Sequence, residues 1–178
     1  RATDLNPGAG SSNPNNLVVL NGNLYFFAQD VTNGAYKLYQ RTAAGVTTAI
    51  ATLPATGQPP AQLTVVGNRL FFVVDTGTLG SPSLQLFSSD GTSAALVRDV
   101  NAAGNDAIAS LTNVNGTLFF VGNDGTGFKV FRSDGTAAGT VAASGNFTTA
   151  PSNLATANGR LFFTASDAAN GSELWTIG

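Results

Sequence analysis

The amino-acid sequence predicts an all-β fold, a small β-propeller of four four-stranded antiparallel blades, and three observations lead to it. A six-residue segment recurs four times, tight-turn signals separate short alternating segments, and no segment carries the apolar period of a stable helix. The segment is marked by Leu24, Leu70, Leu118 and Leu161, which lie 46, 48 and 43 residues apart. A repeat period in this range is typical of propellers and solenoids.

Each repeat reads as a meander of four strands, and the third repeat shows this most clearly. Asn115-Gly116 separates its first two strands and is a strong hairpin signal, because a type I′ turn requires positive φ at both central positions. Asp134-Gly135 gives a second signal, between the third and fourth strands. The strands expected in this repeat are 111–114, 118–121, 128–131 and 140–143.

All the repeats are expected to belong to one domain, residues 1–178. In the predicted fold they form a ring that the N-terminal strand closes. The repeats are 17–52, 63–100, 111–144 and 154–178. The last one ends soon after its third strand, and the missing fourth strand is expected at residues 2–5, because 3–6 resembles 98–101. Pairing these residues with the last repeat hides two open sheet edges.

Two alternatives to that closure remain open. The repeats could form an open stack, or the N-terminal strand could complete the last blade of a neighbouring molecule, which is strand addition between chains. Such a head-to-tail contact builds a filament when it does not close, and a larger ring when two chains meet.

The composition excludes several functional classes. Charged residues make up 10% of the chain, the net charge is −2, and there is no Cys, His or Met. Without Cys and His the chain lacks disulfides, the usual general base and the commonest transition-metal ligands, so we expect no catalytic residue, no cofactor and no metal site. Scattered basic residues argue against nucleic acid, and no apolar run is long enough for a membrane span. The missing Met predicts a processed product or an excised segment.

Four aspartates are the candidate site residues. Each ends a second strand and opens a loop, so in a ring the four would form a circle of carboxylates on one rim, able to bind a cation or sugar hydroxyls. The competing interpretation is that each Asp only starts its loop, by accepting a backbone N–H two residues later as an Asx turn. The four residues are Asp30, Asp75, Asp124 and Asp167.

The turn segments resemble a known bacterial repeat. Residues 131–140, residues 87–92 and Glu173-Leu174-Trp175 are similar to the repeat written ELWxxDGT, which recurs in tandem in large secreted and surface proteins. Only the last copy has Glu-Leu-Trp, and only the middle two have Ser-Asp-Gly-Thr. The resemblance implies propeller-like blades in an exported bacterial protein with a scaffolding or binding role, and it carries no catalytic residue to this chain.

The function expected from these observations is that of a non-enzymatic extracellular module that binds or scaffolds at a cell surface, with a glycan or a surface protein as partner. Long connections rich in Pro, Asn, Gly and Ser join the repeats and offer neutral hydrogen-bonding groups. The alternative is a structural subunit of an extracellular filament or assembly that self-associates through its N-terminal strand. The connections are 7–16, 54–62, 102–110 and 145–153.

Overall fold

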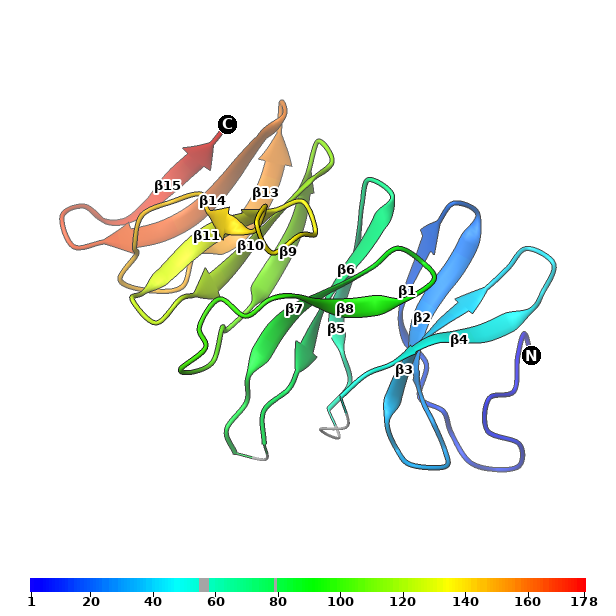
Figure 1. The fold of residues 1–178 in the computed structure, drawn as a ribbon. Coiled ribbons are helices and arrows are strands. Elements are labelled where there is room, and N and C mark those ends of the chain that lie inside the picture. The colour runs from blue at the N-terminus through cyan, green and yellow to red at the C-terminus, as the bar shows by residue number, and fades with distance from the viewer. Residues whose placement is uncertain (55–57, 79) are drawn as a thin grey trace.

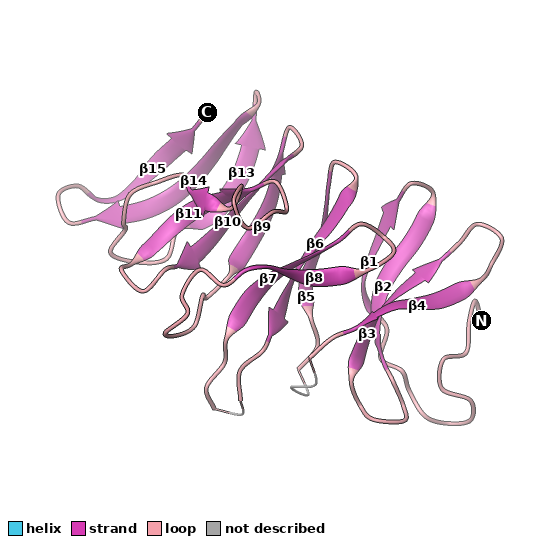
Figure 2. Ribbon diagram, viewed as in Figure 1, coloured by secondary structure: helices cyan, strands magenta, loops and turns pink. Residues whose placement is uncertain are grey.

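The structure, a computed structural model, describes residues 1–54, 58–78 and 80–178 as a row of antiparallel β-sheets (Figures 1 and 2). Residues 55–57, within the second predicted connection, lie outside the described part of the chain. The described residues contain strands, turns and loops but no helix, and accordingly none that could cross a membrane. The predicted all-β class is confirmed.

Fifteen strands form four meanders in chain order. The first sheet contains β1 (Asn15–Leu20), β2 (Asn23–Gln29), β3 (Tyr36–Arg41) and β4 (Thr47–Thr52). The second contains β5 (Ala61–Val66), β6 (Arg69–Asp75), β7 (Leu84–Ser89) and β8 (Ala94–Arg98). The third contains β9 (Ala109–Val114), β10 (Thr117–Asn123), β11 (Phe128–Ser133) and β12 (Val141–Ala142). The last contains β13 (Ser152–Ala157), β14 (Arg160–Asp167) and β15 (Gly171–Ile177).

The last sheet therefore differs from the prediction, because it has three strands and not four. Residues 2–5 form no strand and do not pair with β15. Instead Ala2 and Thr3 lie beside Leu17, Leu24 and Phe26 of the first sheet. Figure 1 places the two ends of the chain at opposite ends of the row, so the N-terminal segment is too far from β15 to complete its sheet. The predicted closure of the ring within one chain is not confirmed.

The repeated turn dictates the register of each sheet. In the first sheet Leu20 pairs with Asn23 across Asn21 and Gly22, which both have positive φ, as a two-residue hairpin requires. Each first strand also contains a residue in the left-handed region at the same place in the repeat, where the pairing with the second strand shifts. These residues are Asn16, Gln62, Ser110 and Asn153.

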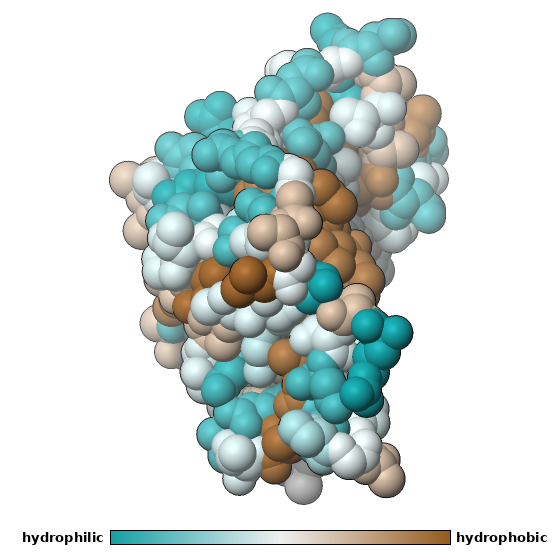
Figure 3. All heavy atoms as spheres, turned by 90° about the vertical axis from the view of Figure 1, so that its right-hand side faces the viewer, coloured by the Kyte–Doolittle hydropathy of each residue, from teal (hydrophilic) through white to brown (hydrophobic). Residues whose placement is uncertain are grey.

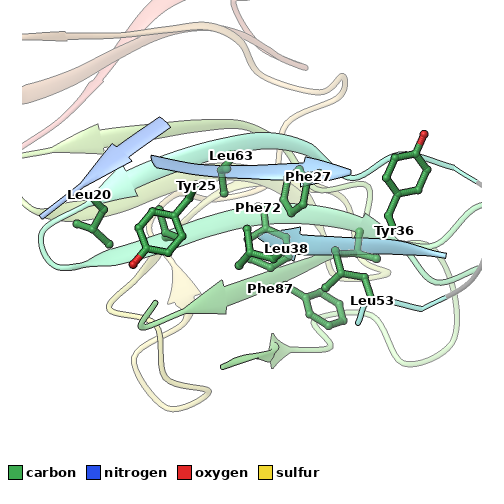
Figure 4. Close-up of a cluster of buried hydrophobic side chains, with 11 residues drawn as sticks. Leu20, Tyr25, Phe27, Tyr36, Leu38, Leu53, Leu63, Phe72 and Phe87 are labelled. Atoms are coloured by element: carbon green, nitrogen blue, oxygen red, sulfur yellow. The ribbon is translucent and has the colours of Figure 1, made fainter. Parts of the chain in front are cut away.

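Apolar clusters between consecutive sheets form the core. Side chains alternate along a strand, so the paired aromatic residues of each second strand point to opposite faces of their sheet. Between the first two sheets, Phe27 and Phe72 meet edge to face with ring centroids 5.1 Å apart, and Phe87 stacks on Phe72 at 6.0 Å (Figure 4). Leu38 closes the same cluster and is completely buried. These aromatic contacts hold the first two sheets against each other.

The antiparallel order determines which loops share an edge. Loops after β2, β6, β10 and β14 and the connections between sheets all lie at one edge of the row, which we call the loop edge. The first strands of the sheets lie next to one another. Asn113 donates its side-chain N–H to the Val65 carbonyl at 3.0 Å, and the Thr156 hydroxyl donates to the Asn113 carbonyl at 3.5 Å. These links set the spacing of the sheets.

Candidate ligand-binding edge

Asp30 and Asp124, two of the four predicted site residues, open their loops in the same way. The Asp30 Oδ1 accepts hydrogen bonds from the backbone N–H of Thr32 at 2.9 Å and from its hydroxyl at 2.7 Å. Asp124 accepts the same pair of bonds from Thr126, at 3.0 and 2.7 Å. Both side chains thus form the Asx turn that the sequence offered as the structural alternative.

A lysine on the next strand neutralises each of these carboxylates. Lys37 lies with its Nζ 2.6 Å from the Asp30 Oδ2, and Lys129 pairs with the Oδ2 of Asp124. The Lys37 hydrogen bond, helped by those from Thr32, holds the pKa of Asp30 well below its usual range. The Lys129 hydrogen bond is the main cause that lowers the pKa of Asp124 to about 2. Neither site needs a further cation to balance its charge.

Asp75 and Asp167 accept backbone N–H groups and have no lysine beside them. The Asp75 Oδ1 accepts from Gly77 and from Ser83, both at 2.9 Å. The Asp167 Oδ1 accepts from Ala169 at 2.9 Å and from Asn170 at 2.6 Å, and the Asn170 amide bonds also lower the pKa of Asp167. Among the described residues, neither carboxylate forms a salt bridge.

The four aspartates lie in four separate loops along the loop edge. Among the described residues, no three acidic side chains come together in a group that could hold a metal ion. The structure thus explains each Asp as a turn residue, and ligand binding by the four residues stays a prediction.

Asp99, directly after β8, and Asp106, in the third connection, lie close together but are unsuitable as an acid–base pair. Asp106 has no exposed surface and accepts the backbone N–H groups of Val100 and Asn101, both at 3.1 Å. Burial, with a contribution from the Asp99 charge, raises the pKa of Asp106 to about 6. Because its oxygens face the inside of the loop, Asp106 stabilises the connection and has no access to a substrate.

A cavity of about 280 Å³ opens beside the Asp167 loop, between the third sheet and the last. Trp175, which is half-buried, forms one wall, and Phe147 packs against it edge to face at 5.2 Å. The indole N–H of Trp175 donates to the Ala165 carbonyl at 3.0 Å, which fixes the orientation of the ring. Polar groups at the opening come from Ser144, Asn146, Asp167 and Thr176.

Sequence analysis missed this cavity although its parts carried a signal. Trp175 is the single tryptophan of the chain and occupies a position that Tyr39, Phe87 and Phe131 occupy in the other repeats. The third repeat also has the shortest fourth strand, β12, and the chain then passes through 143–147 before it crosses to the last sheet. These residues after β12 and Trp175 border the cavity together.

Another hollow of about 410 Å³ lies at the loop edge of the second sheet. It is bordered by Asp75 together with Pro59 and Pro82. The described residues that line it include no aromatic side chain. The hollow beside Trp175 therefore offers the better combination of an apolar wall and polar groups.

No protein-family model and no curated protein matches the sequence. Among solved structures, dipeptidyl peptidase 4 of Porphyromonas gingivalis is similar at 14% identity and a TM-score of 0.55, over 90% of this chain and 24% of the peptidase chain. The computationally designed Ika8 protein is similar at 18% identity and a TM-score of 0.53, over 92% of this chain and 46% of the designed one. A puromycin hydrolase aligns at 18% identity and a TM-score of 0.46, over 94% of this chain and 30% of the hydrolase.

This chain thus spans less than half of each of these proteins. At such low identity the likeness bears on architecture and not on activity. Together with the order of the strands, this likeness establishes the architecture. The chain has an all-β fold of antiparallel sheets that stand side by side as the blades of a propeller do.

Proposed function

We propose that this chain is a non-enzymatic extracellular binding module and that its ligand is a glycan held in the cavity beside Trp175. The observation that carries the proposal is the composition of that cavity. A half-buried indole, fixed by its bond to Ala165, lies next to neutral amide and hydroxyl groups and one carboxylate. Binding sites for small molecules combine an apolar or aromatic wall with a few such polar groups.

The polar groups suit a ligand rich in hydroxyls. Asn146 donates one amide N–H to the Thr126 carbonyl and keeps its second N–H and its oxygen. The hydroxyls of Ser144 and Thr176 donate to backbone carbonyls, so they offer a ligand acceptors, as does the Asp167 carboxylate. Asp167 is one of the four carboxylates singled out in the sequence. It is also the one that lines this cavity, so the proposal retains one of the predicted site residues and places the binding at one loop.

The absence of enzymatic activity is supported by the way the carboxylates are used. Glycoside hydrolysis needs two carboxyl groups about 5 to 10 Å apart across the scissile bond. Asp167 is the single acidic residue among those lining the cavity, and Asp106 is buried inside its own connection. The exported, bacterial location rests on the resemblance to ELWxxDGT repeats and on the low content of charged residues.

Closure of the sheets into a propeller ring is part of the same proposal. Within one chain, closure would require residues 2–5 to leave the first sheet and travel to β15 at the other end of the row. Closure between chains requires no such span. The open row therefore favours the alternative in which the N-terminal strand completes the last sheet of a neighbouring molecule.

The tryptophan itself reports on binding, because Trp175 is the only one in the chain. We expect an array of immobilised oligosaccharides to identify binders, and the soluble form of each binder to shift the fluorescence of Trp175 in a saturable way. Asp167→Asn and Asn146→Ala should each weaken this binding roughly fivefold, since each alters or removes a hydrogen bond worth about 1 kcal/mol. Asp90→Asn is the matched control, because Asp90 also starts a turn but lies in the β7–β8 hairpin at the opposite edge.

Two results would contradict the proposal. Binding without any change in Trp175 fluorescence would place the ligand elsewhere. Turnover of an oligosaccharide that is lost in Asp167→Asn would make the chain an enzyme.

A further inference from the structure

The three contacts between consecutive sheets are built from the same two faces. We call the face of a sheet that contacts the following sheet its trailing face, and the opposite one its leading face. The trailing face of the first sheet contributes Leu20, Tyr25, Phe27 and Leu38 to the first cluster. The leading face of the second sheet contributes Leu63, Leu70, Phe72 and Phe87 to it.

The same repeat positions form the other two contacts. The second sheet presents Val66, Phe71 and Leu86 on its trailing face, and the third presents Leu118, Phe120 and Phe131 on its leading face. In the third contact, Val130 of the trailing face meets Leu161 and Phe163 of the leading face of the last sheet. A leading face thus pairs with a trailing face in every contact.

The first sheet has a leading face with no sheet in front of it. Its residues at these positions are Leu17, Leu24, Phe26 and Tyr39, and Phe26 stacks on Tyr39 at 5.6 Å. Leu17 is 60% exposed, whereas Leu63, the residue at the same repeat position in the second sheet, is 7% exposed. Figure 3, which views the molecule from the end formed by the first sheet, shows apolar atoms open to solvent there.

The last sheet has a trailing face with no sheet behind it. Leu174 occupies the position of Leu38, Leu86 and Val130, which are at most 1% exposed, yet Leu174 is 71% exposed. Phe162, at the position of Tyr25 and Phe71, lies on the same face. The molecule therefore ends in two unmatched halves of the contact that it makes three times internally.

We propose that these two end faces bind each other between two copies of the chain, head to tail, so that two copies close one ring. The leading face of each copy packs on the trailing face of the other, and the contact made internally is then made twice more. This inference rests on the closure between chains proposed above and names its surfaces, whereas the ligand cavity beside Trp175 is tested separately by its fluorescence.

The open edge of β15 supports the same arrangement. In the first three sheets the third strand pairs with a fourth, but β15 has none. In the middle of the chain, β8 pairs with β7 and then leads through a connection into β9 of the next sheet. Residues 2–5 precede β1 in the chain as the end of β8 precedes β9. Since β8 pairs with the third strand of the preceding sheet, residues 2–5 should pair with β15, the third strand of the last sheet of the other copy.

The N-terminal segment must move to allow this. In the single chain it covers part of its own leading face, where Ala2 and Thr3 border a cavity of about 230 Å³ together with Leu17 and Phe26. In the assembly, residues 2–5 can pair as a strand with β15 of the other copy, a pairing that they do not make in the single chain.

The number of copies follows from the fold. A head-to-tail contact closes a ring if the rotation fits and otherwise continues as a filament. Two copies make the smallest ring in which every end face is covered by another. A ring of two copies is therefore the expected product.

Sedimentation of the purified chain tests the association. We expect the wild type to sediment at twice the 18.0 kDa of one chain, and Leu174→Glu to sediment at half the wild-type mass. Leu174→Glu should fold, because the side chain is exposed in the single chain. Val46→Glu is the control: Val46 is also exposed, at 58%, but lies in the hairpin between β3 and β4 and should leave the mass unchanged.

Cross-linking distinguishes a ring from a filament. Val65 and Asn113 are hydrogen-bonded neighbours in adjacent sheets, as are Asn113 and Thr156, so Thr156 of one copy should lie beside Val19 of the other. Since the chain has no cysteine, the double variant Val19→Cys, Thr156→Cys can be treated with a short bis-maleimide. A covalent dimer as the largest product supports the ring, and a ladder of higher oligomers overturns it. A monomeric wild type overturns the association itself and means that something other than a second copy covers the end faces.

Discussion

Phe72 stands between two aromatic rings, Phe27 of the first sheet and Phe87 of its own. Its ring meets Phe27 edge to face at 5.1 Å and Phe87 in a stacked arrangement at 6.0 Å. Phe27 and Phe72 are both completely buried. Edge-to-face and offset-stacked pairs are the favoured aromatic geometries, so this contact stabilises the position of one sheet on the next beyond the burial of area.

Replacing Phe72 by Ala should destabilise the fold strongly. The substitution removes a buried ring and leaves a cavity that the flanking strands cannot close, which typically costs about 3–5 kcal/mol. Val46→Ala, in an exposed hairpin, should change the free energy of unfolding by less than about 0.5 kcal/mol. Urea denaturation followed by Trp175 fluorescence compares the two, and a loss below about 1 kcal/mol for Phe72→Ala would mean that the sheets do not depend on this contact.

Calcium should leave the stability unchanged. Asp30 and Asp124 are already paired with Lys37 and Lys129, and no group of three acidic residues in the described part of the chain could hold a metal. A ligand raises the melting temperature only if it binds the folded state more tightly than the unfolded one. Thermal unfolding with and without millimolar CaCl₂ should give the same Tm. A rise with calcium that disappears in Asp124→Asn and Asp167→Asn would restore the carboxylate rim as a cation site.

The stability should fall as the pH rises from about 4 to about 6. Burial raises the pKa of Asp106 from 3.8 to about 6, so in this window the folded state binds a proton that the unfolded state has released. The loss amounts to at most about 3 kcal/mol, since each pKa unit corresponds to about 1.4 kcal/mol. Asp124, whose pKa is lowered to about 2, acts in the other direction and only below about pH 4.

Asp106→Asn tests that assignment. The variant has no carboxyl group at this position, so its unfolding free energy, measured by urea denaturation at several pH values, should be nearly flat between pH 4 and 6. Asp90→Asn should keep the wild-type slope, because the pKa of Asp90 is lowered to about 2 and the group titrates outside this window. The same slope in Asp106→Asn as in the wild type would assign the pH dependence to another group.

Two glycines should respond in opposite ways to replacement by Ala. Gly116 has φ +83° and Gly145 has no positive φ, while an added Cβ at either position meets no neighbouring atom. Gly116→Ala should therefore cost about 1–2 kcal/mol through the backbone alone, and Gly145→Ala should be neutral or stabilise by up to about 1 kcal/mol. Equal effects in urea denaturation would show that the turn at Asn115-Gly116 does not need its left-handed geometry.

The sequence was sufficient to predict the sheets because their information is local and repeated. Alternating residues specify the strands, Asn-Gly or Gly-Asn turns specify the first hairpin of each sheet, and four copies at a similar period confirm one another. The predicted strand at residues 2–5 failed for the opposite reason. Its place depended on a contact between the two ends of the row, and no local pattern reports whether four sheets curve far enough to bring those ends together.

The candidate site was predicted less well for a related reason. The period identified Asp30, Asp75, Asp124 and Asp167 as equivalent, and the structure makes them equivalent as turn residues. The cavity beside Trp175 arises where the repeats differ, at a short β12 and a single tryptophan. A comparison of the repeats identifies the residues that all copies share. A cavity that depends on residues of one copy becomes visible only in the packed structure.

Hydrogen exchange along β15 tests most directly whether the ends of the row complete each other. In the head-to-tail pair, the free backbone groups of Gly171–Ile177 bond to residues 2–5 of the second copy. The amides at this edge should then exchange roughly tenfold or more slowly in the wild type than in Leu174→Glu. Fast exchange in both proteins, with no protection of β15 as the wild-type concentration rises, would contradict the account.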